Sequence, residues 1–345
     1  MKISRGATLA LASAALFGAS TPLAKRLVGE MPPVLVAGLL YLGSGAGLGL
    51  FRIVRHGQRG TLSPREMPWL AGAIVFGGIV APVLLMAGLR STPAAVASLL
   101  LNLEGVFTAV LAWFVFHENF DRRIALGMVL IVAGGLVLSW QPGGSLGISA
   151  GALAVIIACL CWAVDNNLTQ KVSGADPVTV AATKGSVAGV INVAMAFAVG
   201  AAPPPLPAVL AALAVGLVGY GVSLALFVLA LRHLGTARTG AYFSIAPFVG
   251  AAASLVLFRE PIGLRLAAPG ILMMAGVWLH LSERHQHEHR HEALAHMHRH
   301  VHDEHHRHEH AEGTDPREPH THPHRHEPLT HTHPHYPDIH HRHRH

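Results

Sequence analysis

Charged residues are scarce in this sequence. Asp, Glu, Lys and Arg make up 13% of the 345 residues, whereas hydrophobic residues make up 51%. A soluble domain carries about 25% charged residues, so this composition argues against a soluble globular protein and excludes a chain that is disordered throughout. The 36 glycines follow no three-residue period, which excludes a collagen-like fibre. The class that remains is a helical membrane protein.

Cysteines are also few, and catalytic motifs are lacking. The two cysteines, Cys159 and Cys161, are two residues apart in an apolar run. On a helix they face different directions, so we expect no disulfide between them. The chain has no Walker sequence, so ATP hydrolysis by this chain is not supported. No nucleophile–base arrangement can be assigned. We therefore predict that the protein is not an enzyme and that it requires no cofactor.

Ten apolar runs divide residues 1–281, and each is close to the ~20 residues that a membrane-spanning helix needs. The first run resembles a secretory signal, but nine further runs follow it, so we interpret it as an uncleaved span. The predicted fold is an all-α membrane protein with ten transmembrane helices followed by a disordered tail. The expected spans are 5–25, 32–52, 68–89, 93–115, 123–140, 148–169, 177–199, 207–230, 236–257 and 264–281.

The cations at the ends of these runs predict the orientation. With the N-terminus inside, the inner segments carry eleven Lys and Arg residues and the outer segments carry five. The positive-inside rule therefore places both termini in the cytoplasm of a multi-pass protein of the inner (plasma) membrane. Because these cations flank apolar runs, we do not interpret the basic balance as nucleic-acid binding. The inner set is Lys2, Arg5, Arg52, Arg55, Arg59, Arg65, Arg122, Arg123, Lys171, Arg232 and Arg238.

The chain contains an internal repeat. Phe116-His117-Glu118 aligns with Phe258-Arg259-Glu260 at an offset of 142 residues, and Pro32 aligns with Pro177 at an offset of 145. Each half holds five spans, an odd number, so the second half enters the membrane inverted. We expect one repeat at 1–140, a second at 141–281 and a low-complexity cytoplasmic tail at 282–345. Inverted repeats are typical of transporters, whose sites lie near the membrane midplane between the repeats.

Ten spans in two such halves resemble the drug/metabolite transporter (DMT) superfamily, and specifically its EamA-type members. Leu103-Glu104-Gly105-Val106-Phe107 is similar to the Leu-Glu-Pro-x-Phe element of the fourth span, with Gly105 where proline is common. Glu118 and Glu260 resemble the glutamate that closes each half. The resemblance implies secondary active transport, often export, of metabolites, amino acids or drugs, and it places Glu104 near the central cavity.

Polar residues inside the spans are the candidates for substrate binding or coupling, because such groups are costly in a membrane unless they face partners or water. Lys184 lies deep in the seventh span, and Asp165 of the sixth span is its nearest candidate counter-ion. The pair would bind a zwitterionic substrate or couple transport to protons; the alternative is a structural ion pair that fixes helix register. The full set of candidates is Asp165, Asn166, Lys184, Glu104, Asn102, Thr21, Tyr242 and Ser244.

Two further features are interpreted as structural. Glu118 and Glu260 lie at span ends, where Glu260 can pair with Arg265. In the second span, Gly43-x-x-x-Gly47 and Gly45-x-x-x-Gly49 allow close helix approach, either within the bundle or in a homodimer.

Histidine dominates the C-terminal tail. Of the 27 histidines, 23 follow Leu281, and His-x-His recurs throughout this segment. Imidazole is a common ligand of Ni²⁺, Zn²⁺, Co²⁺ and Cu²⁺, so we expect the tail to bind divalent metal and to be disordered without it. A buffering tail and a pH-sensing tail are the alternatives. The candidate ligands are His285, His287, His289, His291, His296, His298, His300, His302, His322, His324, His326, His331, His333 and His335.

These features favour a secondary transporter that exports a small organic metabolite, amino acid or drug-like solute and carries a metal-binding tail. The alternatives are a Ni, Co or Zn exporter whose tail collects cytosolic ions, and a membrane-anchored metal buffer or sensor. Lys184 argues against a cation in the central site. The expected partners are the lipid bilayer and a small-molecule substrate but no nucleic acid, and a coupling proton and a homodimer remain open.

Overall fold

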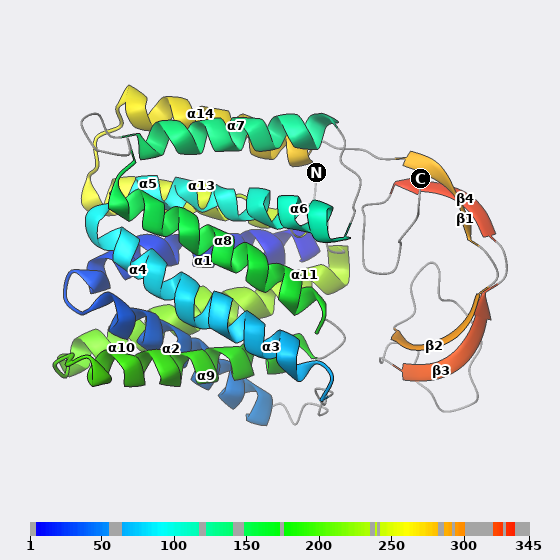
Figure 1. Ribbon diagram of the computed structural model, residues 1–345, viewed down its shortest axis with the longest axis horizontal. Coiled ribbons are helices and arrows are strands. Elements are labelled where there is room, and N and C mark those ends of the chain that lie inside the picture. The colour runs from blue at the N-terminus through cyan, green and yellow to red at the C-terminus, as the bar shows by residue number, and fades with distance from the viewer. Residues whose placement is uncertain are drawn as a thin grey trace. The chain divides into compact units, whose positions relative to one another are not determined.

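A computed structural model describes most of the chain. The described residues are 5–54, 64–116, 122–140, 148–172, 176–234, 239 and 242–281, together with four strands between residues 286 and 334. The chain separates into two compact units, Met1–Glu283 and Arg284–His345. The first unit is a bundle of helices (Figure 1).

The first half of the bundle contains five helical segments, two of which are interrupted. They are α1 (Arg5–Val28), α2 (Pro33–Val54), a third made of α3 (Met67–Ala73), the π-helix η1 (Ile74–Val80) and α4 (Ala81–Ser91), a fourth made of α5 (Ala94–Leu100) and α6 (Asn102–Phe116), and α7 (Arg122–Ser139).

The second half repeats this order. Its elements are α8 (Ala150–Gln170), α9 (Pro177–Ala198), then α10 (Leu206–Val215), the π-helix η2 (Gly216–Val222) and α11 (Ser223–Leu234), followed by α13 (Ala246–Phe258) and α14 (Leu264–Leu281).

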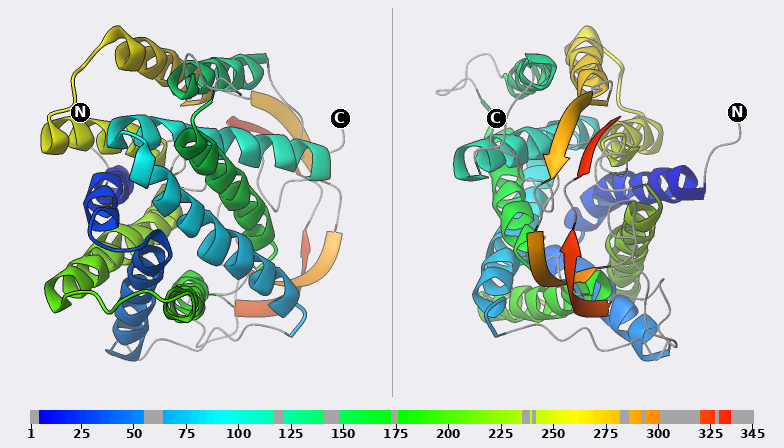
Figure 2. Two further views of the ribbon diagram at one scale, coloured as in Figure 1. Left: turned by 60° about the vertical axis from the view of Figure 1, so that its left-hand side comes forward. Right: turned by 90° about the vertical axis from the view of Figure 1, so that its right-hand side faces the viewer.

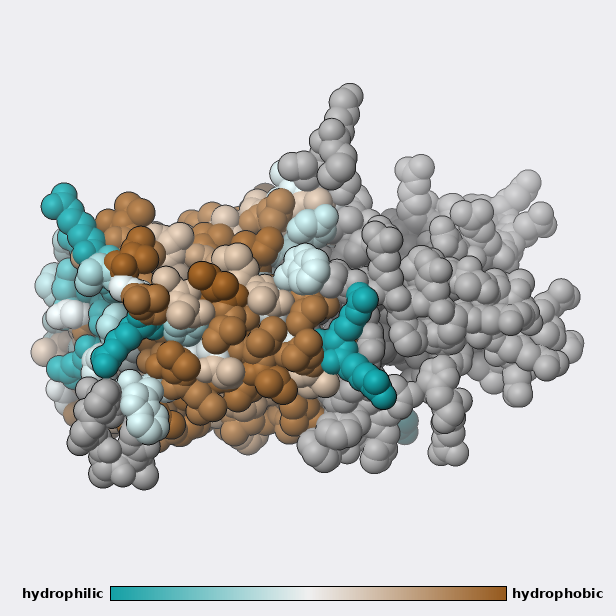
Figure 3. Space-filling view, turned by 90° about the horizontal axis from the view of Figure 1, so that it is seen from above, coloured by the Kyte–Doolittle hydropathy of each residue, from teal (hydrophilic) through white to brown (hydrophobic). Residues whose placement is uncertain are grey.

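Eight helical segments of the described chain are long and apolar enough to cross a membrane. They correspond to the first eight expected spans. The ninth and tenth expected spans correspond to α13 and α14, which are apolar but shorter. A total of ten membrane spans therefore stays a prediction. Figure 3 shows apolar residues over the middle of one face of the bundle and hydrophilic residues toward its ends, as a membrane protein requires.

Helix contacts occur in related pairs. Helix α1 packs against α13 and α11, and α8 packs in the same way against α6 and α4. The two largest interfaces join equivalent helices of the two halves, α2 with α9 and α7 with α14, and Figures 1 and 2 show α7 and α14 side by side. The same helix contacts therefore recur in the two halves, as a structural repeat requires.

The interruptions also match between the halves. The π-helices begin at Ile74 and Gly216, which are 142 residues apart. At their ends, Ala81 N–H donates to the Phe76 carbonyl and Ser223 N–H donates to the Val218 carbonyl, again 142 residues apart. A turn at Leu101 separates α5 from α6, and a turn at 244–245 precedes α13. Both halves therefore carry a π-helix in the third segment and a break in the fourth.

The glycine motif of α2 serves packing inside the bundle. A Cβ at Gly45 would overlap the backbone of Ser186 in α9, and a Cβ at Gly43 would overlap the Leu213 carbonyl in α10. Glycine at these positions lets the helices approach closely. Nothing lies within 4 Å of a Cβ at Gly49. A homodimer through this motif stays a prediction.

The expected pairing of Glu260 with Arg265 is wrong. The carboxylate of Glu260 accepts hydrogen bonds from the backbone N–H groups of Ala94 (2.9 Å) and Ala95 (3.3 Å), at the N-terminus of α5. Unsatisfied N–H groups and the helix dipole favour an anion there. Nearby, Lys25 Nζ donates to the carbonyls of Leu89 (2.6 Å) and Thr92 (2.7 Å). Glu118 lies outside the described residues.

The C-terminal unit differs from the expected tail without regular structure. Strand β1 (Gln286–His291) pairs antiparallel with β4 (Leu329–Pro334), and β2 (Leu294–His300) pairs antiparallel with β3 (His320–His326). Histidine at every second residue matches the two-residue period of a strand. A prediction of disorder from composition alone does not take this spacing into account.

Candidate functional site

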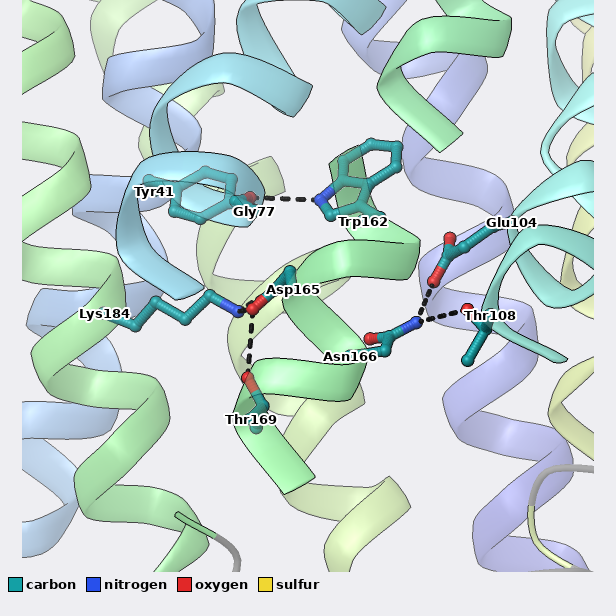
Figure 4. A network of polar contacts seen from close by, with 9 residues as sticks. All are labelled: Tyr41, Gly77, Glu104, Thr108, Trp162, Asp165, Asn166, Thr169 and Lys184. Atoms are coloured by element: carbon teal, nitrogen blue, oxygen red, sulfur yellow. Dashed lines mark hydrogen bonds and ion pairs between the residues drawn. The ribbon is translucent and has the colours of Figure 1, made fainter. Parts of the chain in front are cut away.

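An ion pair joins α8 and α9 inside the bundle. Lys184 Nζ contacts both carboxylate oxygens of Asp165, and Thr169 Oγ1 donates to Asp165 Oδ1 at 3.0 Å (Figure 4). Asp165 is 4% exposed and the Lys184 side chain is 17% exposed. Asp165 precedes the end of α8 by five residues and Lys184 follows the start of α9 by seven, so both lie about 8–10 Å inside the helix ends. The counter-ion expected for Lys184 is therefore the one it contacts.

The π-helix η1 passes directly over this carboxylate. A Cβ at Gly77 would overlap the carboxylate group of Asp165, so only glycine fits here without a shift. The Gly77 carbonyl accepts hydrogen bonds from Tyr41 Oη (2.6 Å) and Trp162 Nε1 (3.0 Å). In a π-helix this carbonyl would bond to the residue five positions later, which is Pro82 and has no N–H. Tyr41 and Trp162 supply the donors that the helix lacks.

A second polar group lies on the other side of α8. Asn166 Nδ2 donates to Glu104 Oε1 (2.9 Å) and lies 3.2 Å from Thr108 Oγ1, which links α8 to α6 (Figure 4). Glu104 is half-buried and Asn166 is exposed. A glutamate in the middle of a span is stable only where it faces protein or water. Since Asp165 and Asn166 are adjacent in sequence, one turn of α8 connects both polar groups.

Aromatic rings extend from this site into the second half. The ring centroids of Tyr41 and Tyr220 are 5.7 Å apart, those of Tyr220 and Phe17 are 5.6 Å apart, and those of Phe17 and Phe243 are 5.4 Å apart. The contact of Tyr220 with Phe17 is edge-on, a geometry that aromatic pairs prefer, and the other two contacts are tilted. The rings join α2, η2, α1 and the segment before α13, so they span both repeats beside the polar groups.

Four of the eight candidate residues come together in the site: Asp165, Asn166, Lys184 and Glu104. Asn102 has a different place, because its Nδ2 donates to the Leu99 carbonyl (2.9 Å) within the break of the fourth segment. Thr21 is buried in α1, and Tyr242 and Ser244 lie just before α13.

Tyr41 and the Gly77 carbonyl are not among the sequence-based candidates. The signal that could have revealed them is a proline five residues after a glycine within an apolar run.

The candidate metal ligands fall in the C-terminal unit. Among the residues whose side chains the structure describes, no group of three or more His, Cys, Asp or Glu could hold a metal ion. His285, His302 and His335 lie outside the described residues. The other eleven histidines lie in β1–β4, where the structure gives the backbone and its register.

Comparisons with known proteins agree with this architecture. The sequence profile of the EamA-like transporter family matches residues 4–140 and 149–282. An "uncharacterized transporter" of Methanothermobacter thermautotrophicus is 28% identical over 281 residues, which cover 76% of this chain and 82% of that protein. A "probable amino-acid metabolite efflux pump" of Salmonella typhimurium is 26% identical over 299 residues, which cover 79% and 93%. A solved crystal structure shares the fold, with a TM-score of 0.61 at 19% identity over 81% of this chain and 96% of the other.

Proposed function

Because the chain belongs to the EamA-like transporter family, we propose that it exports a small organic solute across the inner membrane by secondary active transport, with both termini in the cytoplasm. We further propose that the solute is a zwitterion of the amino-acid class. The contact between Asp165 and Lys184 carries this proposal, since it places both signs of charge at one point inside the bundle.

An ammonium and a carboxylate on one small molecule match this pair. The opposite charges of the two side chains neutralise one another, which lowers the cost of placing them in the membrane. A zwitterion exchanges partners with them, its ammonium taking Asp165 and its carboxylate taking Lys184, so the net charge inside the bundle stays the same. The similarity to a protein named as an amino-acid metabolite efflux pump supports the same substrate class.

Glu104 is the proposed site of the coupling proton. Its carboxylate accepts a hydrogen bond from Asn166, which follows Asp165 in the sequence and has an exposed side chain. The donor to Glu104 is a neutral amide, whereas the carboxylate of Asp165 contacts the Lys184 ammonium, and this difference supports Glu104 as the proton site. Proton uptake at Glu104 would then accompany substrate release.

The test is transport by the purified full chain in proteoliposomes with an imposed pH gradient, using a panel of radiolabelled amino acids. We expect transport of at least one amino acid by the unmodified protein and loss of it in Asp165→Asn and in Lys184→Met. Lys171→Met is the matched control, because Lys171 is an exposed lysine at the end of α8. It should transport normally.

Metal content of cells that express the same variants tests the alternative, which is transport of a metal ion. If expression lowers cellular nickel, zinc or cobalt, measured by elemental analysis, and the Asp165→Asn and Lys184→Met variants do not, the cargo is a metal ion and the proposal is wrong. If the protein moves neither solutes nor metals and only retains metal in the cell, it acts as a buffer.

A further inference from the structure

Histidines occupy directly opposed register positions in both strand pairs of the C-terminal unit. In the β2–β3 pair, the directly opposed residues include His296 with His324, His298 with His322 and His300 with His320. In the β1–β4 pair they include His287 with His333 and His289 with His331. Five His–His pairs therefore arise between segments that are far apart in the sequence.

All the pairs of one ladder lie on the same face. Residues two apart in a strand share a face, and directly opposed residues in an antiparallel pair share it too. The alternate positions of β2–β3 are Ala295 with Arg325, Met297 with Pro323 and Arg299 with Thr321, so the other face carries no histidine. The β2–β3 ladder thus has one face with three consecutive histidine pairs.

We propose that these cross-strand histidine pairs are binding sites for divalent transition-metal ions, with two adjacent pairs supplying four imidazole ligands. Opposed Cα atoms in an antiparallel ladder are about 4.5–5.5 Å apart, within reach of two imidazoles on one ion. Zn²⁺ takes imidazole nitrogen at about 2.0–2.1 Å and accepts four such ligands, and Ni²⁺ and Cu²⁺ favour the same donor. The β2–β3 ladder has the most consecutive histidine pairs, and one of its four-imidazole sites is His296, His298, His322 and His324.

The pattern tolerates errors of strand pairing. A slip of two residues keeps histidines on the same face, whereas a slip of one would move a whole strand's histidines to the other face. Protonated imidazoles repel one another across the strands, but neutral imidazoles that share an ion hold the strands together. An ion bound by His298 and His322 joins positions that are 24 residues apart, so metal binding and strand pairing stabilise each other.

This inference is independent of the transported solute. It concerns a unit separate from the helical bundle, and it distinguishes a built site from the general affinity of a histidine-rich chain. A chain with no fixed pairing would bind metal in proportion to its number of histidines, whichever ones remain. The paired site depends on particular ones.

The test compares two variants of the full chain that each lose four histidines. One carries His296→Gln, His298→Gln, His322→Gln and His324→Gln; the control carries His305→Gln, His306→Gln, His308→Gln and His310→Gln, from the connection between β2 and β3. Zn²⁺ and Ni²⁺ affinities are measured by competition with a chromophoric chelator, and bound metal is counted by elemental analysis after dialysis.

Since the β1–β4 ladder keeps its two histidine pairs, we expect the first variant to retain less metal per chain after dialysis than the unmodified protein, and the control to retain as much as the unmodified protein. Equal weakening of both variants, or unchanged binding by the first, would overturn the proposal. Transport should be the same in both.

A second measurement tests the register itself. Arg299→Cys with Thr321→Cys places two thiols at directly opposed positions on the histidine-free face of β2–β3. A short bismaleimide should join them, and Zn²⁺ should raise the yield. The control pair, Arg299→Cys with Arg325→Cys, is not opposed in this register and should cross-link less. A yield that ignores Zn²⁺, or that is equal in both pairs, contradicts the ladder site.

Discussion

The five-segment halves of the bundle share their interruptions but not their charges. Both halves have a π-helix in the third segment, starting at Ile74 and at Gly216, and a break in the fourth. At the matched offset of 145 residues, however, Asp165 corresponds to Ser20 and Lys184 corresponds to Leu39. At the offset of 142, Glu104 corresponds to Ala246.

The two halves thus share their helix breaks and close contacts but differ in their charged residues. Small residues at close contacts recur, since Gly77 lies against Asp165 while Gly219 lies against Ser20 in the equivalent place. The repeat therefore fixes where helices break and approach one another. The unmatched residues place the ion pair in one half: Asp165 and Lys184 meet between α8 and α9, whereas the matched positions of the first half are Ser20 and Leu39.

The largest expected effect comes from breaking the unmatched ion pair. Asp165→Asn or Lys184→Met alone leaves one buried charge without its partner, which costs about 3–5 kcal/mol of stability. Ser20→Ala, at the matched position of the first half, should cost about 1 kcal/mol. Thermal unfolding of the detergent-purified variants measures both.

The double variant completes this thermodynamic cycle. Asp165→Asn combined with Lys184→Met leaves no unpaired charge, so it should be more stable than either single variant. If it is the least stable of the three, the pair does not interact in the way that its geometry indicates.

The two matched glycines give the next effect. Gly77→Ala and Gly219→Ala each add a Cβ to a filled space, which costs about 1–3 kcal/mol. Only the first displaces the carboxylate of Asp165, so Gly77→Ala should also reduce the transport rate per folded protein, while Gly219→Ala should leave most of it. Equal loss of transport in both would show that the halves are functionally equivalent, contrary to the asymmetry described above.

The Gly77 carbonyl gives a smaller effect. Tyr41→Phe or Trp162→Phe removes one of its two hydrogen bonds, at about 0.6–1 kcal/mol in a membrane. Removing both leaves the carbonyl without a donor, because Pro82 cannot supply one, and should cost more than the sum of the single changes. A double-mutant cycle of thermal stability checks this, and strict additivity would contradict it.

The smallest effect concerns the start of α9. Asp176 Oδ2 accepts hydrogen bonds from Thr179 N–H (2.9 Å) and Thr179 Oγ1 (2.7 Å), and it caps the helix. Asp176→Ala should cost about 1 kcal/mol of stability without changing the transport rate per folded protein. Asp176→Asn keeps an acceptor and should be close to neutral. A transport defect in Asp176→Ala would show that this cap also has a role in the transport cycle.

Much of the site could be predicted from the sequence because its main residues break a strong pattern. A lysine or carboxylate in a long apolar run stands out by itself, and the short connection between α8 and α9 brings Asp165 close to Lys184. By contrast, Glu104 and Asn166 are 62 residues apart, and their hydrogen bond depends on how α6 packs against α8. The place of Glu260 at the start of α5, 166 residues away from Ala94 in the chain, was missed for the same reason.

The sequence by itself determined the membrane class, the two halves and the polar residues available inside the spans, because these follow from hydropathy, spacing and charge along the chain. The tertiary structure decided which of these residues meet. The π-helix that brings Gly77 over Asp165, and the two donors that satisfy its carbonyl, depend on close packing of α2, α8 and η1. Such contacts arise between surfaces of several helices at once, which no local pattern along one helix records.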